Sequence, residues 1–204
     1  MTTLRALALN CTLKPSPAES STDLMVSQVL SALAGHGVTT ESVRVVDHDV
    51  RPGVEVDMGD GDEWPGLLER VAAADILIVA TPTWVGHMSS VAQRVLERLD
   101  AELSSTDDEN RPRMVGKVAV AAVVGNEDGA HKIVADLFQG LNDIGFSIPA
   151  QGCTYWNGEA MSGTDFKDLS EVPEQVSTTT QALARNAVHL STVLRERQYP
   201  PYPD

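Results

Sequence analysis

Cysteine is scarce in this chain of 204 residues, which contains only Cys11 and Cys153. The two lie far apart in the sequence and neither belongs to a CxxC pair, so neither a disulfide framework nor a thiolate metal site is indicated. A chain of this length can bury a sizeable core without such cross-links. Because free cysteines are typical of a reducing compartment, we expect a cytoplasmic protein.

Long apolar runs are also missing. No run approaches the roughly 18 residues that a membrane-spanning helix needs. The first nine residues contain a short apolar stretch, but they lack the charged region and long apolar core of an export signal. We therefore expect a soluble protein without a membrane partner.

Basic residues are few. The chain has 15 Lys and Arg residues and 29 Asp and Glu residues, which give a formal charge of −14. This charge repels phosphate backbones, so nucleic acid is not expected as a partner. The acidity suits either a solvated surface or the docking of a positively charged redox partner.

Several functional motifs are absent as well. The sequence has no GxxxxGK[ST] loop, no GxGxxG fingerprint and no GxSxG elbow, which argues against a nucleoside triphosphate site, a Rossmann dinucleotide site and an α/β-hydrolase. Residues 57–63 look like a calcium loop, but Gly59, Gly61 and Leu68 occupy positions that should hold ligands. We interpret this acidic segment as a solvated loop.

Short apolar segments alternate with segments of helical periodicity along the whole chain. This alternation predicts one domain over residues 1–204, an open parallel sheet with helices on both faces. A proline-rich tail, residues 197–204, is expected to be extended and could lie on a neighbouring subunit. The predicted strands are residues 4–9, 40–46, 75–80, 117–124 and 146–153, and the predicted helices are residues 23–34, 67–73, 91–99, 132–142 and 176–195.

The loop after the first strand, residues 10–22, is rich in hydroxyl groups and carries one lysine just before a helix. In such sheets, ligands bind outside the carboxyl ends of the strands. A helix amino terminus with short hydroxyl side chains forms an anion cradle, here for a monophosphate. The alternative is that Ser21 or Thr22 only caps the helix.

The segment after the third strand, residues 80–90, is expected to break that strand at Pro82 and to present Trp84 and Gly86. Trp84 could fill the core, but at a strand end it is also well placed to stack on a flat ring. Gly86 would let backbone N–H groups approach the polar edge of such a ring.

These segments resemble the flavodoxin-like NAD(P)H-dependent FMN reductase family. Thr12, Lys14, Ser21 and Thr22 look like its phosphate loop, although the usual Gly-Ser start is Cys-Thr here and the loop is longer. Residues 81–89, Thr-Pro-Thr-Trp-Val-Gly-His-Met-Ser, resemble the Pro-x-Tyr-x-Gly-x-Met-Ser segment that wraps the isoalloxazine ring. Residues 125–131 resemble the glycine-rich turn after strand four. The resemblance covers residues 4–155, and the missing cysteine cluster excludes the iron–sulfur branch of the family.

The resemblance implies a flavodoxin-like, doubly wound, five-stranded parallel sheet of order 2-1-3-4-5. It also implies bound FMN, NAD(P)H as a transient co-substrate, and a homodimer or homotetramer. Quinones, nitro- or azo-aromatics and free flavin are plausible small-molecule electron acceptors, and no catalytic acid or base is required because the chemistry belongs to the cofactor. The expected cofactor-binding residues are Thr12, Lys14, Ser21, Thr22, Pro82, Thr83, Trp84, Val85, Gly86, Gly125, Asn126, Gly129 and His131.

Two other functions remain open at this point. The domain could be a non-catalytic electron carrier that docks partners through its acidic surface, or a scaffold whose cofactor site has decayed. His87 and His131 could orient a hydride donor or a quinone oxygen, but a lone histidine in a loop is more often a surface residue. Cys11 is expected to be a small buried hydrophobe rather than a reactive thiol.

Overall fold

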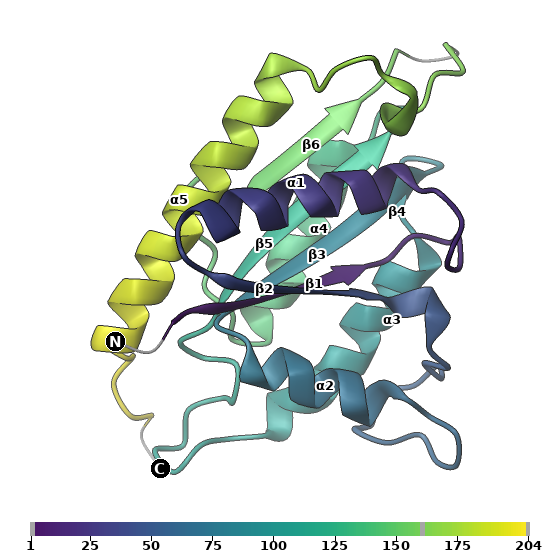
Figure 1. The fold of residues 1–204 in the computed structure, drawn as a ribbon. Helices are drawn as coiled ribbons and strands as arrows, with labels where there is room; N and C mark the ends of the chain where they lie inside the picture. The colour runs from purple at the N-terminus through teal and green to yellow at the C-terminus, as the bar shows by residue number, and fades with distance from the viewer. Residues whose placement is uncertain (1–2, 160–161, 203–204) are drawn as a thin grey trace.

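The computed structural model describes residues 3–159 and 162–202 and shows strands and helices alternating along the chain (Figure 1). The strands are β1 (Arg5–Asn10), β2 (Thr39–Arg44), β3 (Ile76–Trp84), β4 (His87–Met88), β5 (Val118–Gly125) and β6 (Cys153–Asn157). The helices are α1 (Ser21–Gly35), α2 (Trp64–Ala73), α3 (Ser90–Leu99), α4 (Ala130–Asp143) and α5 (Glu174–Glu196).

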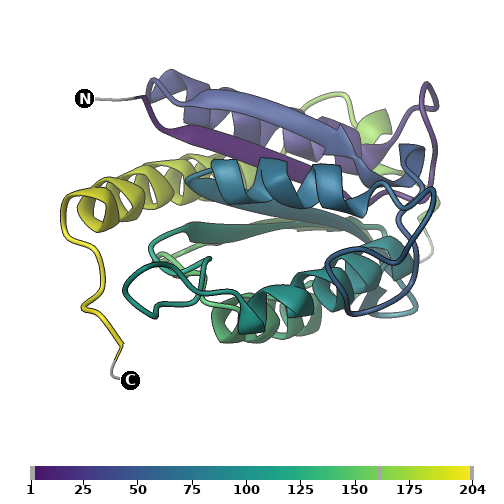
Figure 2. The same cartoon turned by 90° about the horizontal axis from the view of Figure 1, so that it is seen from below.

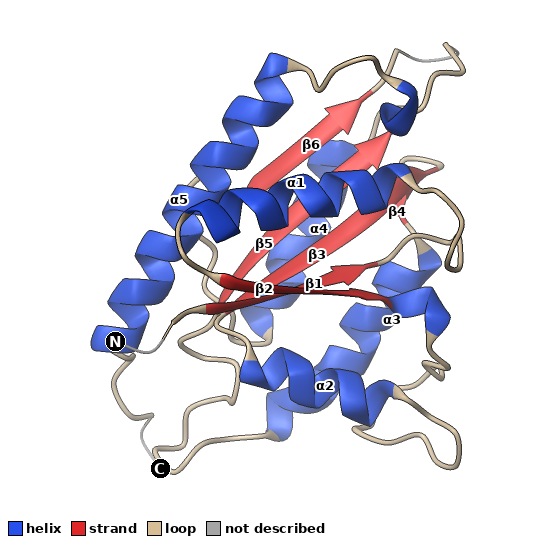
Figure 3. Ribbon diagram, viewed as in Figure 1, coloured by secondary structure: helices blue, strands red, loops and turns tan. Residues whose placement is uncertain are grey.

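The five long strands form one parallel sheet in the order β2-β1-β3-β5-β6 (Figure 3). If β4 is left out and the five parallel strands are numbered consecutively, this is the 2-1-3-4-5 order of the flavodoxin fold, which confirms the fold prediction. The two-residue strand β4 is an addition, since it pairs antiparallel with the end of β3. All carboxyl ends of the parallel strands therefore meet along one edge of the sheet.

The sheet lies between two helical layers (Figure 2). Its strand residues belong alternately to two cores. Leu77 and Val79 of β3 pack with α2, α3 and α4, whereas Ile76 and Ile78 pack with α1 and α5. Because β3 and β5 are buried on both faces, their sequences are continuously apolar, as is typical of central parallel strands. Each fully buried branched side chain contributes about 1.5–3 kcal/mol to the free energy of unfolding.

Three predicted strand boundaries were wrong. The last strand is Cys153–Asn157 and not residues 146–153, where Ser147 makes only an isolated bridge to Val118. Pro82 does not break the third strand, because β3 continues to Trp84 and pairs with β4. The second strand ends at Arg44, after which residues 45–47 turn into a short 3-10 helix.

The acidic segment after β2 is not fully solvated, contrary to the prediction. The side chains of Asp62 and Arg98 are both 0% exposed, and Arg98 Nη2 lies 2.7 Å from Asp62 Oδ2. Arg98 also donates to the backbone carbonyls of Arg51, Glu55 and Val56. One buried guanidinium therefore fastens the 51–62 loop to α3.

The carboxyl end of α5 returns to the start of β3, where Arg195 pairs with Asp75 at 2.8 Å. The tail then packs on its own chain, since Tyr199 O accepts from Arg111 at 2.9 Å and Tyr202 N donates to Glu109 O at 3.1 Å. Residues 203–204 of the predicted tail lie outside the described residues. Among the helices that the structure describes, none is long and apolar enough to cross a lipid bilayer.

Candidate functional site

The carboxyl edge of the sheet carries a cavity of about 190 Å³ that contains most of the predicted site residues. Figure 1 shows the connections after β1, β3, β5 and β6 gathered at this edge. Nine of the thirteen predicted residues line the cavity, namely Thr12, Lys14, Ser21, Thr22, Pro82, Thr83, Trp84, Gly125 and Asn126. Segments that are far apart in the sequence are thus brought together where doubly wound folds bind ligands.

The loop between β1 and α1 supplies a wall of hydroxyl groups. Thr12, Ser20 and Thr22 are buried, and Ser20 Oγ donates to Thr12 Oγ1 at 3.0 Å. Ser20 is the N-cap of α1, yet its side chain makes no capping hydrogen bond to the described helix. The first amides of an α-helix have no partner within the helix. This end of α1 therefore retains backbone donors and the positive end of its dipole for an anion. Ser20 occupies the cap position, so the alternative that Ser21 or Thr22 only caps the helix is wrong.

Arg44, at the end of β2, shapes the same loop. Its guanidinium donates to the carbonyl oxygen of Ala18 at 2.9 Å and pairs with the Asp23 carboxylate at 3.2 Å. Asn10 Nδ2 donates to the other Asp23 oxygen at 2.9 Å. The negative charge in the first turn of α1 is therefore compensated, and Lys14 remains as the cation in the cavity wall.

The connection from β3 to β4 is a two-residue hairpin. Trp84 pairs with His87, and the central residues Val85 and Gly86 have φ values of 53° and 71°. Positive φ at both central positions is the requirement of a type I′ turn, whose twist matches that of the flanking strands. Trp84 is 52% exposed at the cavity, so this indole is not part of the core and is accessible to a flat ring.

Ser89, the last residue of the motif segment, has a structural role. It is 1% exposed. Its Oγ accepts from Ala92 N at 3.1 Å, which caps α3, and donates to Cys11 O at 2.7 Å. Ser89 N donates to Thr81 Oγ1 at 3.0 Å. This serine therefore joins the ends of β1 and β3 to the start of α3 and fixes the loops that surround the cavity.

Thr83 presents a hydroxyl group with no partner in the cavity wall. Thr83 is 5% exposed, and its Oγ1 has no hydrogen-bond partner among the described residues. Gly125 lies against it, since a Cβ on Gly125 would come within 2.6 Å of Thr83 Cβ. A buried hydroxyl without a partner is unfavourable. A polar ligand in the cavity would relieve that cost.

Four predicted residues lie outside the cavity wall. Gly86 and Gly129 form the contact between two loops, because a Cβ on Gly129, whose φ is 140°, would come within 2.8 Å of Gly86 Cα. Val85 is 85% exposed at the tip of the hairpin. His131 is in the first turn of α4 rather than in a loop, and its Nε2 lies 2.8 Å from the hydroxyl of Tyr155.

Sequence reasoning missed part of the wall. Ser20, Leu13 and Glu127 belong to segments that it had identified, but they were not selected. The end of the last strand and the loop after it were not considered as part of the site. Trp156 at the end of β6 and Phe166 in the loop pack with ring centroids 5.5 Å apart. The missed residues are Leu13, Ser20, Val124, Glu127, Trp156, Asp165 and Phe166.

Residues 165–167, between β6 and α5, close this side of the cavity. Asp165 accepts from Asn126 Nδ2 at 3.3 Å, and Lys167 N donates to Ser21 Oγ at 3.2 Å. The connection therefore bridges the loop after β5 and the start of α1. Two aromatic residues just after the predicted strand, Tyr155 and Trp156, followed by a polar loop, were the available signal for this wall.

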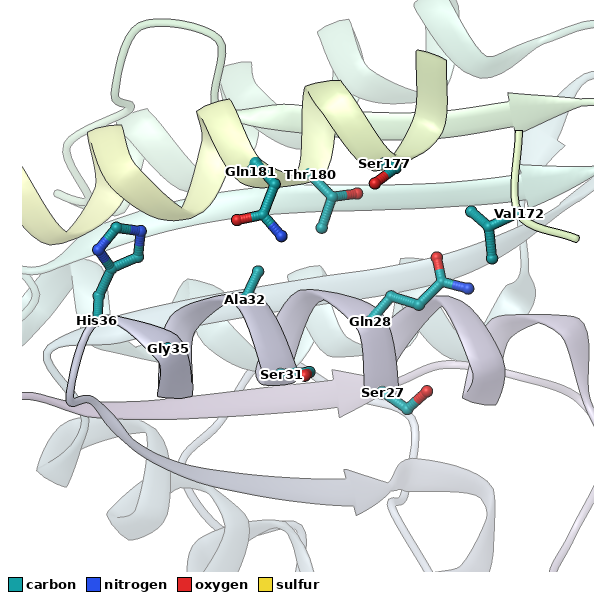
Figure 4. Close-up of a pocket in the computed structure, with 10 residues that line it drawn as sticks. All are labelled: Ser27, Gln28, Ser31, Ala32, Gly35, His36, Val172, Ser177, Thr180 and Gln181. Carbon is teal, nitrogen blue, oxygen red and sulfur yellow. The ribbon is translucent and has the colours of Figure 1, made fainter. Parts of the chain in front are cut away.

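A second, wider hollow of about 570 Å³ lies on the flank of the molecule, between α1 and α5. Figure 4 shows Gln28 of α1 and Gln181 of α5 reaching between the two helices, with Thr180 beside them. This groove shares no lining residue with the cavity at the sheet edge and carries none of the predicted site residues. We therefore place the functional site at the sheet edge.

Cys11 lies directly beneath the edge site and is fully buried. Burial raises the pKa of its thiol far above the ordinary value, so it is protonated at neutral pH. Because the thiolate is the reactive form of cysteine, Cys11 acts as a small apolar residue, as predicted.

The strand order, the helix-terminus cradle and the aromatic rim define a flavodoxin-like α/β protein. The chain belongs to the NADPH-dependent FMN reductase family, whose model matches residues 4–160. It is therefore a flavin-dependent oxidoreductase by family. It is 32% identical over 206 residues to the 8-demethyl-8-aminoriboflavin-5'-phosphate synthase of Streptomyces davaonensis, covering 96% of this chain and 80% of that protein.

A solved structure of RosB with bound 8-demethyl-8-formylriboflavin-5'-phosphate is similar throughout, with a TM-score of 0.87 and 32% identity. The match covers 96% of this chain and 82% of RosB. The chain is also 37% identical over 199 residues to the divalent metal cation transporter MntH of Mycobacterium bovis. That match covers 94% of this chain but only 29% of the length of the transporter.

Proposed function

We propose that the cavity at the sheet edge binds FMN and that the protein uses it to pass electrons from NAD(P)H to a small aromatic acceptor. The unpartnered hydroxyl of Thr83 carries this proposal, because it is buried in the wall of a cavity that also has an open helix terminus. Phosphate suits the start of α1, and a flat ring suits the exposed indole of Trp84. The family match and the similarity to RosB support a phosphorylated flavin.

The protein's part in the reaction is binding and orientation. Bound FMN would supply hydride acceptance from NAD(P)H and two-electron transfer to a quinone, nitro- or azo-aromatic compound, or free flavin. The residues around Thr12 and the first turn of α1 hold the phosphate, and Lys14 adds a positive charge. The β3–β4 hairpin, which carries Trp84, borders the ring and, with the neighbouring loops, limits access of water to one side of it.

Anaerobic titration tests this function. Purified protein is titrated with FMN and followed by flavin fluorescence, and NADPH is then added in the same cuvette. Prompt bleaching of the bound flavin, followed by reoxidation with a quinone, is the expected result. Bound flavin that bleaches far more slowly than an enzyme turns over would indicate an electron carrier, and failure to bind FMN would refute the proposal.

A second candidate is that a flavin phosphate is the substrate rather than the cofactor. The similarity to a synthase named for an aminoriboflavin phosphate, over most of both chains, favours this possibility. Mass spectrometry of the flavin recovered after incubation with FMN and an amino donor separates the two. An unchanged mass supports the cofactor role, whereas a change at the ring supports the substrate role.

Family membership also supports a homodimer or homotetramer that acts in the cytoplasm. The two cysteines are free, one buried and the other half-buried, which suits a reducing compartment. Light scattering coupled to size exclusion tests the assembly, and a monomer at micromolar concentration would refute it.

A further inference from the structure

The hairpin beside the cavity contains an unfavourable backbone conformation. Val85 has a φ of 53° and is 85% exposed. Positive φ is strained for a β-branched residue, and Asn or Gly is the usual choice at this position of a type I′ turn. Because its side chain is largely in solvent, packing does little to hold Val85 in this conformation. Strained residues persist only where other contacts maintain them.

Glu127 supplies such a contact from a different loop. Its Oε1 accepts a hydrogen bond from Val85 N at 2.7 Å, across 42 positions of the sequence. A carboxylate has only acceptor atoms when ionised, so it is matched to a free backbone N–H. The neighbouring contact between Gly86 and Gly129 brings the two loops close enough for this bond. Within the turn, His87 Nδ1 also lies 2.8 Å from Val85 O.

We propose that Glu127 is a positioning residue that holds the strained Val85 turn and thereby keeps Trp84 at the mouth of the cavity. The consequence is higher affinity for a flat aromatic ring, because the ring platform is ordered before the ligand arrives. This inference rests on the proposed function for the identity of the ligand, FMN. The effect of Glu127 on the rigidity of the turn does not depend on the proposed function, because it is a property of the ligand-free protein.

The first test measures the turn without any flavin. In ¹⁵N-labelled protein, E127A should accelerate hydrogen exchange of the Val85 amide and lower its heteronuclear NOE, while E127Q, which keeps an acceptor oxygen, should change both little. D128N is the matched control, since it removes a charge from the same loop and keeps an oxygen for the Gly129 amide. An unchanged Val85 amide in E127A overturns the proposal.

The second test measures FMN affinity by fluorescence quenching. E127A should weaken binding about tenfold, the equivalent of one charge-assisted hydrogen bond, and E127Q by much less. V85G removes the strain, so adding E127A to V85G should weaken binding no more than about threefold. A full tenfold loss in the V85G background would show that Glu127 acts directly on the ligand, which overturns the positioning role.

The two tests separate failure of this inference from failure of the proposed function. If the wild-type protein does not bind FMN, the proposed function is refuted, and the exchange of the Val85 amide alone decides the role of Glu127. If FMN binds and E127A leaves both the amide and the affinity unchanged, the proposed function stands and the positioning role is refuted. Circular dichroism of each variant confirms that it is folded.

Discussion

Two threonine hydroxyls in β3 differ in whether they have a hydrogen-bond partner within the protein. Thr81 is fully buried, and its Oγ1 accepts a hydrogen bond from Ser89 N at 3.0 Å. Thr83, two residues later on the same face of the strand, has a hydroxyl with no partner in the described part of the chain. The first hydroxyl is used by the fold, and the second has no partner there, which is why the proposed function assigns it to the ligand.

Replacing each threonine by the nearly isosteric valine should therefore have opposite effects. T83V should raise the free energy of unfolding of the ligand-free protein by about 1 kcal/mol, because it removes an unsatisfied buried group, and it should weaken FMN binding several-fold. T81V should lower the free energy of unfolding by about 1–2 kcal/mol. Urea unfolding and flavin titration measure both quantities. Destabilisation by T83V would show that its hydroxyl is already satisfied without a ligand.

Glu102 predicts a pH dependence of stability. Its side chain is 1% exposed, and neither oxygen has a hydrogen-bond partner among the described residues. Burial raises the pKa of this carboxyl, and the positive charge of Arg113, 3.5 Å away, only partly opposes the effect. A raised carboxyl pKa means that the folded protein binds the proton more tightly, so its stability falls as pH rises above the unfolded value of about 4.3.

E102Q removes that titration. The gain in unfolding free energy of E102Q over wild type should grow between about pH 4.3 and pH 7, when both are measured by urea unfolding. Arg113 keeps a partner in this variant, because Glu69 lies 3.1 Å from its guanidinium. E174Q serves as the control, since Glu174 is an exposed residue at the start of α5. A difference between E102Q and wild type that is the same at both pH values would contradict the prediction.

At the scale of elements, the sequence predicted the order of strands and helices because burial imposes a clear apolar pattern on β3 and β5. It could not predict where strands end. Residues 146–149 are partly apolar, but Pro149 lacks an N–H to donate, and the pairing shifts to Cys153–Asn157. Pro82 is tolerated near the end of β3, where the chain proceeds into the hairpin with β4.

The sequence predicted three of the four loops that line the candidate site, but not the loop after β6. The loops after β1, β3 and β5 follow from the rule that ligands bind at the carboxyl ends of strands. The loop after β6 was missed because the strand itself was placed too early. Ser89 was correctly included in the motif, but its role as a cap and loop tie depends on contacts across 78 positions of the sequence. Long-range contacts of this kind leave no local pattern.

The buried ion pair of Arg98 and Asp62 fastens the 51–62 loop to α3, so its loss should destabilise the fold. R98M leaves the buried Asp62 carboxylate without its cation, which should lower the free energy of unfolding by about 3–5 kcal/mol. R98K should lose less, because it keeps the charge but not the planar fork that reaches the loop carbonyls. Urea unfolding followed by circular dichroism measures the change.

A surface pair provides the control for this anchor. Lys132 and Asp136 form an exposed ion pair on α4, so K132M should change the free energy of unfolding by less than about 1 kcal/mol. Hydrogen bonds from Arg98 and from three backbone amides overcome the desolvation of Asp62 and hold its pKa well below the ordinary value. A loss in R98M as small as that in K132M would show that the backbone amides alone keep Asp62 in place.

At the scale of the whole molecule, the formal charge of −14 acts against the approach of a phosphorylated ligand. FMN carries a phosphate dianion near neutral pH, so the long-range interaction with the protein is repulsive. Cations near the cavity, such as Lys14, Arg44 and Lys167, act only at short range. Arg44 is already paired with Asp23, and Lys167 with Asp168. Salt screens interactions beyond about 10 Å at 0.1 M ionic strength, so it removes the long-range repulsion first.

The association rate constant for FMN should therefore rise with salt. Stopped-flow quenching of flavin fluorescence between about 20 and 200 mM KCl should show an increase of a few-fold, since steering follows the summed field of the protein. K14M should lower affinity and leave this positive slope in place, because it removes a local contact and makes the net charge more negative. A rate constant that falls with salt would mean that the basic residues of the edge site, rather than the whole molecule, govern the encounter.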